Sequence, residues 1–310
     1  MTLSYRWQAG LLFALAVPAL VALPQQSFAQ EDALIEEIIT TGTRRADRSA
    51  ADSPVAIDVI GASEFAQNSS ADVQDMLRTS VPSFDVNTQP ISDAATIVRP
   101  ANVRGLSPDN VLVLVNGKRR HRGSIISFLG GGISEGAQGV DISAIPSLAL
   151  KQVEVLRDGA SSQYGSDAIA GVINFVLRDD ADGAEVYVNY GSTFEGDGTN
   201  YRVAGNLGLP LGNSGFINLT AEINDVEGTI RSVVRSDVQN MIDAGYTPAE
   251  DFLTINSYTS EVPHYWGQPD VEDDVKFFVN SAIELNEAAE AYFFGNYAQR
   301  TVTGGFFYRT

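Results

Sequence analysis

The sequence predicts an α+β domain followed by antiparallel strands of a transmembrane β-barrel, and three observations support this fold class. First, short strand patterns surround one amphipathic helix pattern over about residues 53–180. Second, segments beginning at Ala184 alternate apolar and polar side chains over about ten residues each, the length a tilted strand needs to cross a bilayer. Third, the connections between these segments alternate between short and long, as in outer-membrane barrels. A soluble β-sandwich with one long insertion is the alternative.

Residues 1–29 have the pattern of a cleaved secretory signal peptide. Arg6 supplies a positive charge, and the apolar run from Ala9 to Leu23 is short for a membrane span and is interrupted by Pro18. Small residues then end at Ala29, where we expect cleavage. The alternative is an uncleaved anchor helix.

One helix is expected within the α+β domain. Its N-cap is expected at Ser69 or Ser70, and it should end at Val81-Pro82. The residues expected to form its apolar face are Val73, Met76 and Leu77.

Four strands are expected in the same domain, at residues 55–60, 111–115, 153–156 and 171–178. The second of them, VLVLV, is continuously apolar, as expected of a strand buried on both faces, and Asn116-Gly117 follows as a turn. Four glycines should serve turns or close backbone approaches: Gly105, Gly159, Gly165 and Gly171.

Five barrel strands are expected, at 184–192, 200–209, 216–225 and 275–286, with a fifth beginning at Ala291. Alternation is clearest in the third strand, where Ile217, Leu219, Ala221 and Ile223 oppose Asn218, Thr220, Glu222 and Asn224. Tight turns are expected at 210–215 and 286–290, and a long connection from Val226 to Asp274. Five strands cannot close such a barrel, so we expect the chain to be a fragment of a longer protein.

Composition excludes several function classes. A formal net charge of −19 disfavours nucleic-acid binding, which depends on clustered Lys and Arg. There is no cysteine, and the two histidines, His121 and His264, show no metal-ligand spacing. No phosphate-binding loop or nucleophile motif occurs. We therefore predict no enzyme activity, no catalytic residue, no metal site and no cofactor.

One local cluster of positive charge stands out in this acidic chain: Arg119, Arg120, His121 and Arg122. Guanidinium groups suit carboxylate or phosphate oxygens, so the cluster is a candidate site for an anionic ligand. The alternative is a solvated surface patch.

Several motifs together resemble the TonB-dependent outer-membrane receptors. The stretch EEIITTGTRR, from Glu36 to Arg45, resembles the TonB box. SPVAIDVI, NVRGLSPDNVLVLVNGKR and IPSLALKQVEVLRDGASSQYGSDAIAGVINFVLR resemble the plug domain. The family fold is a 22-stranded barrel with an internal plug. The resemblance implies a TonB box and linker at 30–52, a plug at 53–180 and the first strands of a truncated barrel at 181–310.

The resemblance implies ligand-gated active import across the outer membrane of a Gram-negative bacterium. Expected partners are TonB with its inner-membrane energising complex, a small-molecule or metal-chelate ligand, and outer-membrane lipid. A ferric siderophore is the expected ligand, with cobalamin or an oligosaccharide as alternatives. The rival is a truncated periplasmic binding module without transport.

Site residues follow from the same resemblance. An unpaired strand expected to add to a sheet edge of TonB comprises Glu37, Ile38, Ile39, Thr40, Thr41, Gly42 and Thr43. The alternative is an ordinary first strand of the plug. Arg104 and Arg157 match positions where the family sets arginines against barrel glutamates, although they could instead satisfy carbonyls inside the plug. Ligand contacts are expected from Arg119 to about Gly139 and near Thr88 to Thr96.

Overall fold

The structure is a computed structural model that describes residues 38–39, 41, 48–49, 55–62, 64, 72–86, 93–127, 132–229, 231, 236–245 and 267–304. The expected signal peptide and Ser69, Ser70 and Thr88 lie outside these residues. Across the described ranges, none of the helices combines the length and apolar character needed to span a membrane.

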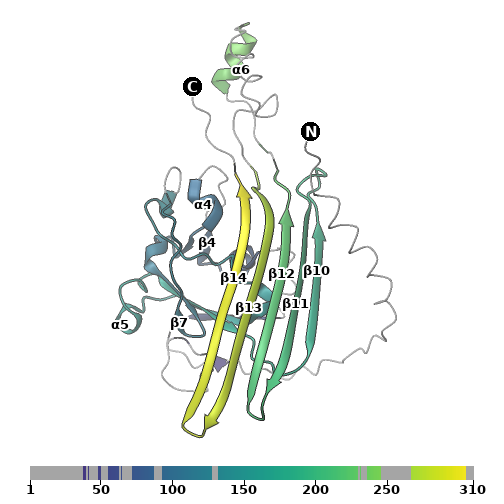
Figure 1. Ribbon diagram of the computed structural model, residues 1–310. Coiled ribbons are helices and arrows are strands. Elements are labelled where there is room, and N and C mark those ends of the chain that lie inside the picture. The colour runs from purple at the N-terminus through teal and green to yellow at the C-terminus, as the bar shows by residue number, and fades with distance from the viewer. Residues whose placement is uncertain are drawn as a thin grey trace, which may run out of the picture. The chain divides into compact units, whose positions relative to one another are not determined.

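The chain forms an α+β domain and a second sheet of long strands (Figure 1). The α+β domain is built on a five-stranded sheet in the order β3-β8-β9-β6-β7. Its strands are β3 (Ile57–Gly61), β8 (Leu150–Leu156), β9 (Gly171–Leu177), β6 (Val111–Val115) and β7 (Lys118–Arg119). β6 and β9 run parallel, and the other neighbours are antiparallel. A second ladder pairs β4 (Phe84–Val86) with β5 (Ala101–Val103). The helices are α3 (Val73–Ser80), α4 (Asp93–Val98), α5 (Ser161–Tyr164), η4 (Pro108–Asn110), η5 (Gly132–Ser134) and η6 (Ser147–Ala149).

Strand β6 is buried on both faces, as its continuous apolar sequence predicts. Val113 and Val115 belong to the main core, together with Phe175 of β9 and Met76 of α3. Leu112, on the opposite face, belongs to a second apolar cluster. Because side chains alternate along a strand, a strand between two cores must be apolar at every position.

Helix α3 begins later than expected. The N-cap is Asp72, not Ser69 or Ser70, and its Oδ1 accepts a hydrogen bond from the Gln74 N–H at 2.7 Å. A carboxylate at this position also interacts favourably with the positive end of the helix dipole. The expected apolar face is buried, and the helix ends before Val81 as expected.

Two predictions about backbone shape are confirmed. Asn116 and Gly117 have φ of 47° and 71° in the turn between β6 and β7, a conformation that Asn and Gly tolerate best. Gly171 has φ of 155°, and a Cβ there would lie 2.4 Å from the Leu156 carbonyl oxygen. Gly171 therefore permits the close approach of β8 and β9.

The second sheet is an antiparallel meander in the order β10-β11-β12-β13-β14. Its strands are β10 (Ala184–Gly191), β11 (Asn200–Leu211), β12 (Gly215–Val226), β13 (Asp270–Asn286) and β14 (Ala289–Thr303). The five strands and both tight turns are where the alternation predicts them, although β13 and β14 begin earlier than expected. The long connection between β12 and β13 contains α6 (Ser236–Asp243).

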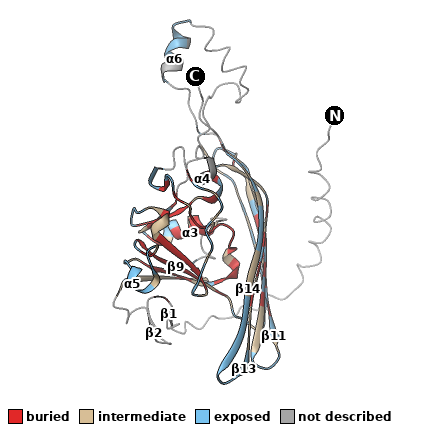
Figure 2. Ribbon diagram, turned by 60° about the vertical axis from the view of Figure 1, so that its left-hand side comes forward, coloured by how far each residue is buried: buried red, intermediate tan, exposed pale blue. Residues whose placement is uncertain are grey.

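In this sheet the burial pattern is the reverse of that in a soluble protein, because apolar side chains are exposed and polar side chains are buried (Figure 2). Apolar side chains such as Val188, Ile223 and Phe277 are exposed on the outer face. Polar side chains such as Arg202 and Lys276 are buried on the inner face, each 2% exposed. Apolar-out and polar-in alternation is typical of a barrel wall that faces lipid outside and a polar interior.

The strand expected before the α+β domain is paired, not unpaired. β1 (Ile38–Ile39) forms an antiparallel ladder with β2 (Arg48–Ser49), with Ile39 opposite Arg48. Residues expected to act as a linker thus supply its partner strand, and the ladder satisfies backbone hydrogen bonds of both segments.

Candidate functional site

The α+β domain meets the inner face of the second sheet through a largely polar interface. Asn116 Nδ2 donates to Asn280 Oδ1 at 3.2 Å, and Asn280 Nδ2 donates to the Arg178 carbonyl at 2.8 Å. Arg120 Nη1 donates to Asn296 Oδ1 at 2.7 Å. Polar contacts of this kind join two bodies without merging their hydrophobic cores, except where Phe278 enters the core of the α+β domain and Phe294 packs against it.

Four buried charges form an ion-pair network along the inner face, which we call the wall quartet: Arg202, Glu222, Asp274 and Lys276. Glu222 Oε2 accepts from Arg202 Nε at 2.9 Å, and Glu222 Oε1 accepts from Lys276 Nζ at 2.7 Å. Lys276 Nζ also lies 3.2 Å from Asp274 Oδ2. The side chains are at most 5% exposed, so each charge depends on its partners rather than on water.

The wall strands also bond directly to the α+β domain through two arginines. Arg202 Nη2 donates to the Ser147 hydroxyl. Arg300 Nη2 donates to the Ile97 carbonyl at 2.6 Å and to Asp141 Oδ1 at 2.9 Å. Two strands of the wall sheet, β11 and β14, therefore present cations to this interface.

The N-cap of α3 contributes an opposing negative charge. Asp72 Oδ2 pairs with Arg99 Nη2, and Arg99 Nη2 also donates to the Ser143 hydroxyl at 2.9 Å. Burial opposes ionisation of Asp72, but Arg99 and then Lys276 outweigh it and lower the pKa of Asp72 to about 2. Burial raises the pKa of the neighbouring Asp75, even though Arg99 lies 3.5 Å away. Asp72 therefore stays ionised under ordinary conditions and faces the wall.

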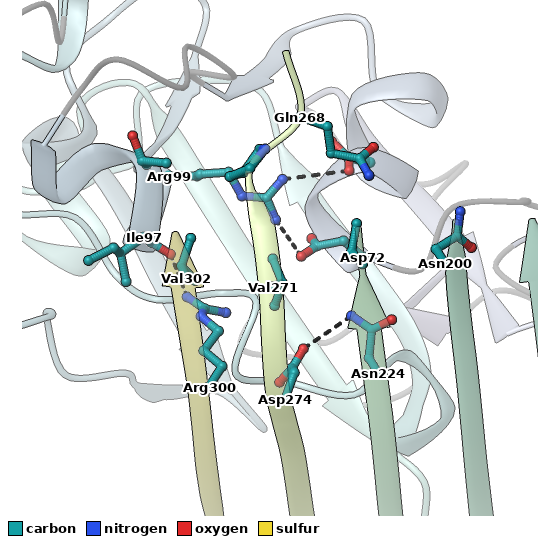
Figure 3. Close-up of a pocket in the computed structure, with 14 residues that line it drawn as sticks. Asp72, Ile97, Arg99, Asn200, Asn224, Gln268, Val271, Asp274, Arg300 and Val302 are labelled. Carbon is teal, nitrogen blue, oxygen red and sulfur yellow. Dashed lines mark hydrogen bonds and ion pairs between the residues drawn. The ribbon is translucent and has the colours of Figure 1, made fainter. Parts of the chain in front are cut away.

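A cavity of about 250 Å³ lies between these groups (Figure 3). Residues of the α+β domain from α3, α4 and the following segment line one side, and β11 to β14 line the other. The charged lining residues are Asp72, Asp75, Arg99, Asp274 and Arg300. The cavity sits at the end of the wall where β12 and β13 are joined by the long connection, because Val226 and Val271 also line it.

The structure does not gather Arg119, Arg120, His121 and Arg122 into one site. Arg119 pairs with Asp167, Arg122 Nη1 lies 3.1 Å from Asp109 Oδ1, and Arg120 bonds to the wall. His121 is exposed. None of the four lines the 250 Å³ cavity, whereas Thr96, from the other expected ligand loop, does.

Arg104 and Arg157 contact groups of their own domain among the described residues. Arg104 Nη1 donates to the Arg157 carbonyl at 3.2 Å and lies 3.7 Å from Asp158 Oδ1. Arg157 Nε pairs with Asp58 Oδ2 at 2.9 Å. Both side chains remain about two-fifths exposed, at 44% and 39%, so they are accessible to further partners.

One residue of the expected TonB box is held by the α+β domain. Thr41 is 1% exposed, and its N–H donates to Glu154 Oε2 at 2.8 Å. The Thr41 hydroxyl donates to the same oxygen. Glu154 is fully buried in β8 and also accepts from Gln152 Nε2 at 2.9 Å and Asn174 Nδ2 at 3.3 Å. Glu37, Thr40, Gly42 and Thr43 lie outside the described residues.

Sequence reasoning placed Glu222 on the polar face of its strand without assigning it a role, and the same alternation places Arg202 and Lys276 on polar faces. The available signal was charge at inward positions of strands whose other face is apolar. The interactions of the wall residues with Asp72, Asp141 and Ser147 could not be predicted from the sequence, because these three residues are distant in sequence from the wall strands.

The comparisons with known proteins support this architecture. Residues 49–172 match the family described as TonB-dependent Receptor Plug Domain. The chain resembles the ferric enterobactin receptor PfeA from Pseudomonas aeruginosa in complex with enterobactin, with a TM-score of 0.57 and 17% identity over 81% of this chain and 34% of that chain. It resembles the siderophore receptor PirA from Acinetobacter baumannii with a TM-score of 0.55 and 19% identity, over 79% of this chain and 32% of that one.

A third match is the ferric citrate transporter FecA in its unliganded form, with a TM-score of 0.53 and 16% identity over 82% of this chain and 32% of that chain. The chain spans about a third of the length of these solved structures. At these identities the matches establish the fold: a plug domain followed by antiparallel strands of the receptor barrel. The matched family is one of transport receptors rather than of enzymes.

Proposed function

Because this chain carries the plug domain and barrel strands of a TonB-dependent receptor, we propose that it is part of a ligand-gated importer in the outer membrane of a Gram-negative bacterium. The imported ligand is a small molecule or metal chelate. A ferric siderophore is the first candidate, because the similar solved structures are named as siderophore and ferric citrate receptors. Export by a cleaved signal peptide at residues 1–29 is part of this proposal.

The observation that carries the proposal is the reversed burial of the wall sheet. Its outer face exposes residues such as Val186, Phe277 and Phe293, as lipid contact requires, while its inner face buries charge against the plug. A soluble sandwich would bury the apolar face instead. The five strands therefore favour a membrane barrel over the sandwich alternative.

The polar interface suits a plug that must move. Separating hydrophobic surfaces exposes apolar area to water, whereas ion pairs and amide contacts can be replaced by water contacts. We propose that TonB supplies the force for this movement, since import against a concentration gradient needs an energy source. Arg104 and Arg157, with their exposed guanidinium groups, would add contacts to barrel glutamates outside the described strands.

The contact between Thr41 and Glu154 supports a resting position for the TonB box. The Glu37–Thr43 segment would bind TonB by adding a strand to its sheet edge, and Thr41 would leave Glu154 when it does so. Among the residues that the structure describes, β1 pairs only with β2, so its other edge is available for a strand of TonB.

A site-directed cross-linking experiment tests the proposal. The chain has no cysteine, so a single Ile38→Cys substitution gives one defined thiol in this chain. In cells expressing the full-length receptor and a TonB with one cysteine on its sheet edge, we expect a disulfide-linked product. Adding Ile39→Pro should remove most of that product, because proline lacks the N–H of a ladder and restricts the strand.

A matched control is cysteine at the exposed position Leu285 near a tight turn of the wall, which should not link to TonB through strand pairing. Equal cross-linking at positions 38 and 285, or full cross-linking in the Ile39→Pro variant, would contradict the assignment. Cross-linking in a receptor that imports none of the ferric siderophores tested, nor cobalamin or an oligosaccharide, would favour a non-transporting binding module.

A further inference from the structure

Residues 178–183 join the plug to the first wall strand, and their backbone lies against the inner face of the wall; we call this segment the strap. The Arg178 carbonyl accepts a hydrogen bond from Asn280 Nδ2 at 2.8 Å, and the Asp180 carbonyl lies 3.5 Å from Asn218 Nδ2. Both asparagines are buried, and they are direct cross-strand partners on β13 and β12. The strap therefore follows one row of polar side chains across the wall.

Gly208 continues this row on β11, where it is the cross-strand partner of Asn218. Its N–H donates to the Gly183 carbonyl at 2.9 Å. A Cβ at Gly208 would lie 2.6 Å from the Asp180 carbonyl oxygen and 2.7 Å from the Asp182 carbonyl oxygen. Glycine at this position therefore lets the backbone of the strap lie directly on the backbone of the wall, and a side chain here would have to displace the strap.

The first residues of the strap are also bonded to the plug and to β10. The Arg178 N–H donates to the Ala149 carbonyl at 2.9 Å, and Arg178 Nη1 pairs with Glu185 Oε2 of β10 at 2.6 Å. Lys151 Nζ donates to Asp179 Oδ1 at 2.9 Å, but this pair is about half exposed and contributes little. A cavity of about 360 Å³, lined in part by Asp179, lies beside the strap. Hydrogen bonds of the main chain, rather than packing on every side, thus hold the strap in place.

The plug is held differently at the other end of the wall. The strap lies near the tight turn that precedes Gly215, whereas the cavity of about 250 Å³ is lined by Val226 at the opposite end of β12. There Arg300 reaches the Ile97 carbonyl and Asp141 through its guanidinium group. A side-chain contact of this kind opens when the side chain rotates and water takes its place. Freeing the strap instead requires lifting its main chain off β11, β12 and β13.

We propose that the strap is the fixed attachment of the plug during import. The plug stays bonded to the wall along residues 178–183 while its contacts at the cavity end open, so it does not leave the barrel as one body. The different contacts at the two ends of the interface give the plug a preferred end at which to open. This inference rests on the proposed import function, because it specifies which part of the moving plug keeps its place.

The test measures distances between spin labels by double electron–electron resonance in the full-length receptor in detergent. This chain has no cysteine, so the labels go on introduced cysteines, and any cysteine in the rest of the receptor is replaced by serine. One label is at the exposed wall residue Leu285, and the other is at Asp182 for the strap distance or at Asp85 for the plug distance. Arg300→Ala combined with Asp72→Asn weakens the contacts at the cavity end. We expect the plug distance distribution to widen about twofold in this variant, while the strap distance distribution keeps its width.

Changes at the strap itself should have the opposite effect. Gly208→Ala places a Cβ against the strap backbone, so the strap distance distribution should widen about twofold. Gly205→Ala is the matched control on the same strand, because its Cβ would come no closer than 3.9 Å to the Glu185 carbonyl oxygen, and it should leave the strap distance unchanged. Asn280→Ala removes the hydrogen bond to the Arg178 carbonyl without adding bulk, and it should also widen the strap distance distribution.

Three results would overturn the proposal. The first is equal widening of the strap and plug distances in the cavity-end variant, which would mean that the plug separates from the wall as one body. The second is an unchanged plug distance in that variant, which would mean that the cavity end is no easier to open than the strap. The third is an unchanged strap distance in both Gly208→Ala and Asn280→Ala. Cross-linking of residue 38 to TonB tests the import function separately, so the two failures are distinguishable.

Discussion

Replacing Glu222 by leucine tests whether the wall quartet stabilises the barrel wall. Glu222 accepts from Arg202 at 2.9 Å and from Lys276 at 2.7 Å. Two cations and two anions balance in the quartet, so the substitution leaves one uncompensated positive charge among side chains at most 5% exposed. Removing one partner of a buried ion pair costs about 3–5 kcal/mol, and we expect the free energy of unfolding to fall by this amount.

The assay is denaturant unfolding of the full-length receptor in detergent, followed by tryptophan fluorescence. Lys276→Met alone should also destabilise the wall, because Glu222 keeps Arg202 but Asp274 loses its buried ammonium partner. Combining the two changes restores charge balance, so the double variant should be more stable than the sum of the single effects predicts, by at least about 1 kcal/mol. Glu284→Leu on the same strand as Lys276 is the control, since Glu284 is exposed and its loss should cost under about 0.5 kcal/mol.

Two results would refute the reasoning about the wall quartet. A loss of less than about 1 kcal/mol for Glu222→Leu would mean that water or rearranged partners compensate the exposed cations. Strict additivity of the two substitutions would mean that Glu222 and Lys276 act independently.

Three further predictions concern the plug. Asp72→Asn keeps the helix cap but removes the carboxylate whose pKa is lowered to about 2 from 3.8, so the variant should lose about 2 kcal/mol of unfolding free energy above about pH 4. A depressed pKa stabilises the fold above the unfolded value, so the deficit should shrink as pH falls from 4 to 2, measured by thermal unfolding against pH. Glu154→Ala should free Thr41 and speed proteolysis of the preceding segment at least several-fold, and an unchanged cleavage rate would argue against this contact. Gly171→Ala should destabilise by about 1–3 kcal/mol in denaturant unfolding, because its Cβ would lie 2.4 Å from the Leu156 carbonyl oxygen; wild-type stability would contradict the close approach.

Some elements could be predicted because their cause is local. The continuous apolar run of β6 indicates burial on both faces. The alternation of apolar and polar residues in β12 indicates that its two faces lie in different environments. Asn116-Gly117 marks a turn because few other residues tolerate its backbone angles. The helix cap was misplaced because several adjacent polar residues can cap, and the partnership of Asp72 with Arg99 favours that position.

The sequence by itself therefore determined the positions of the wall strands, their tight turns and which face of each wall strand is polar. Only the tertiary structure decided which face is buried, how Glu222 connects Arg202 to Lys276, and that Thr41 reaches Glu154. The physical reason is that backbone propensity and side-chain alternation depend on residues that are neighbours in the chain. Ion pairs and cavities depend on residues brought together from distant segments, such as Asn224 with Asp274 and Arg300 with Asp141.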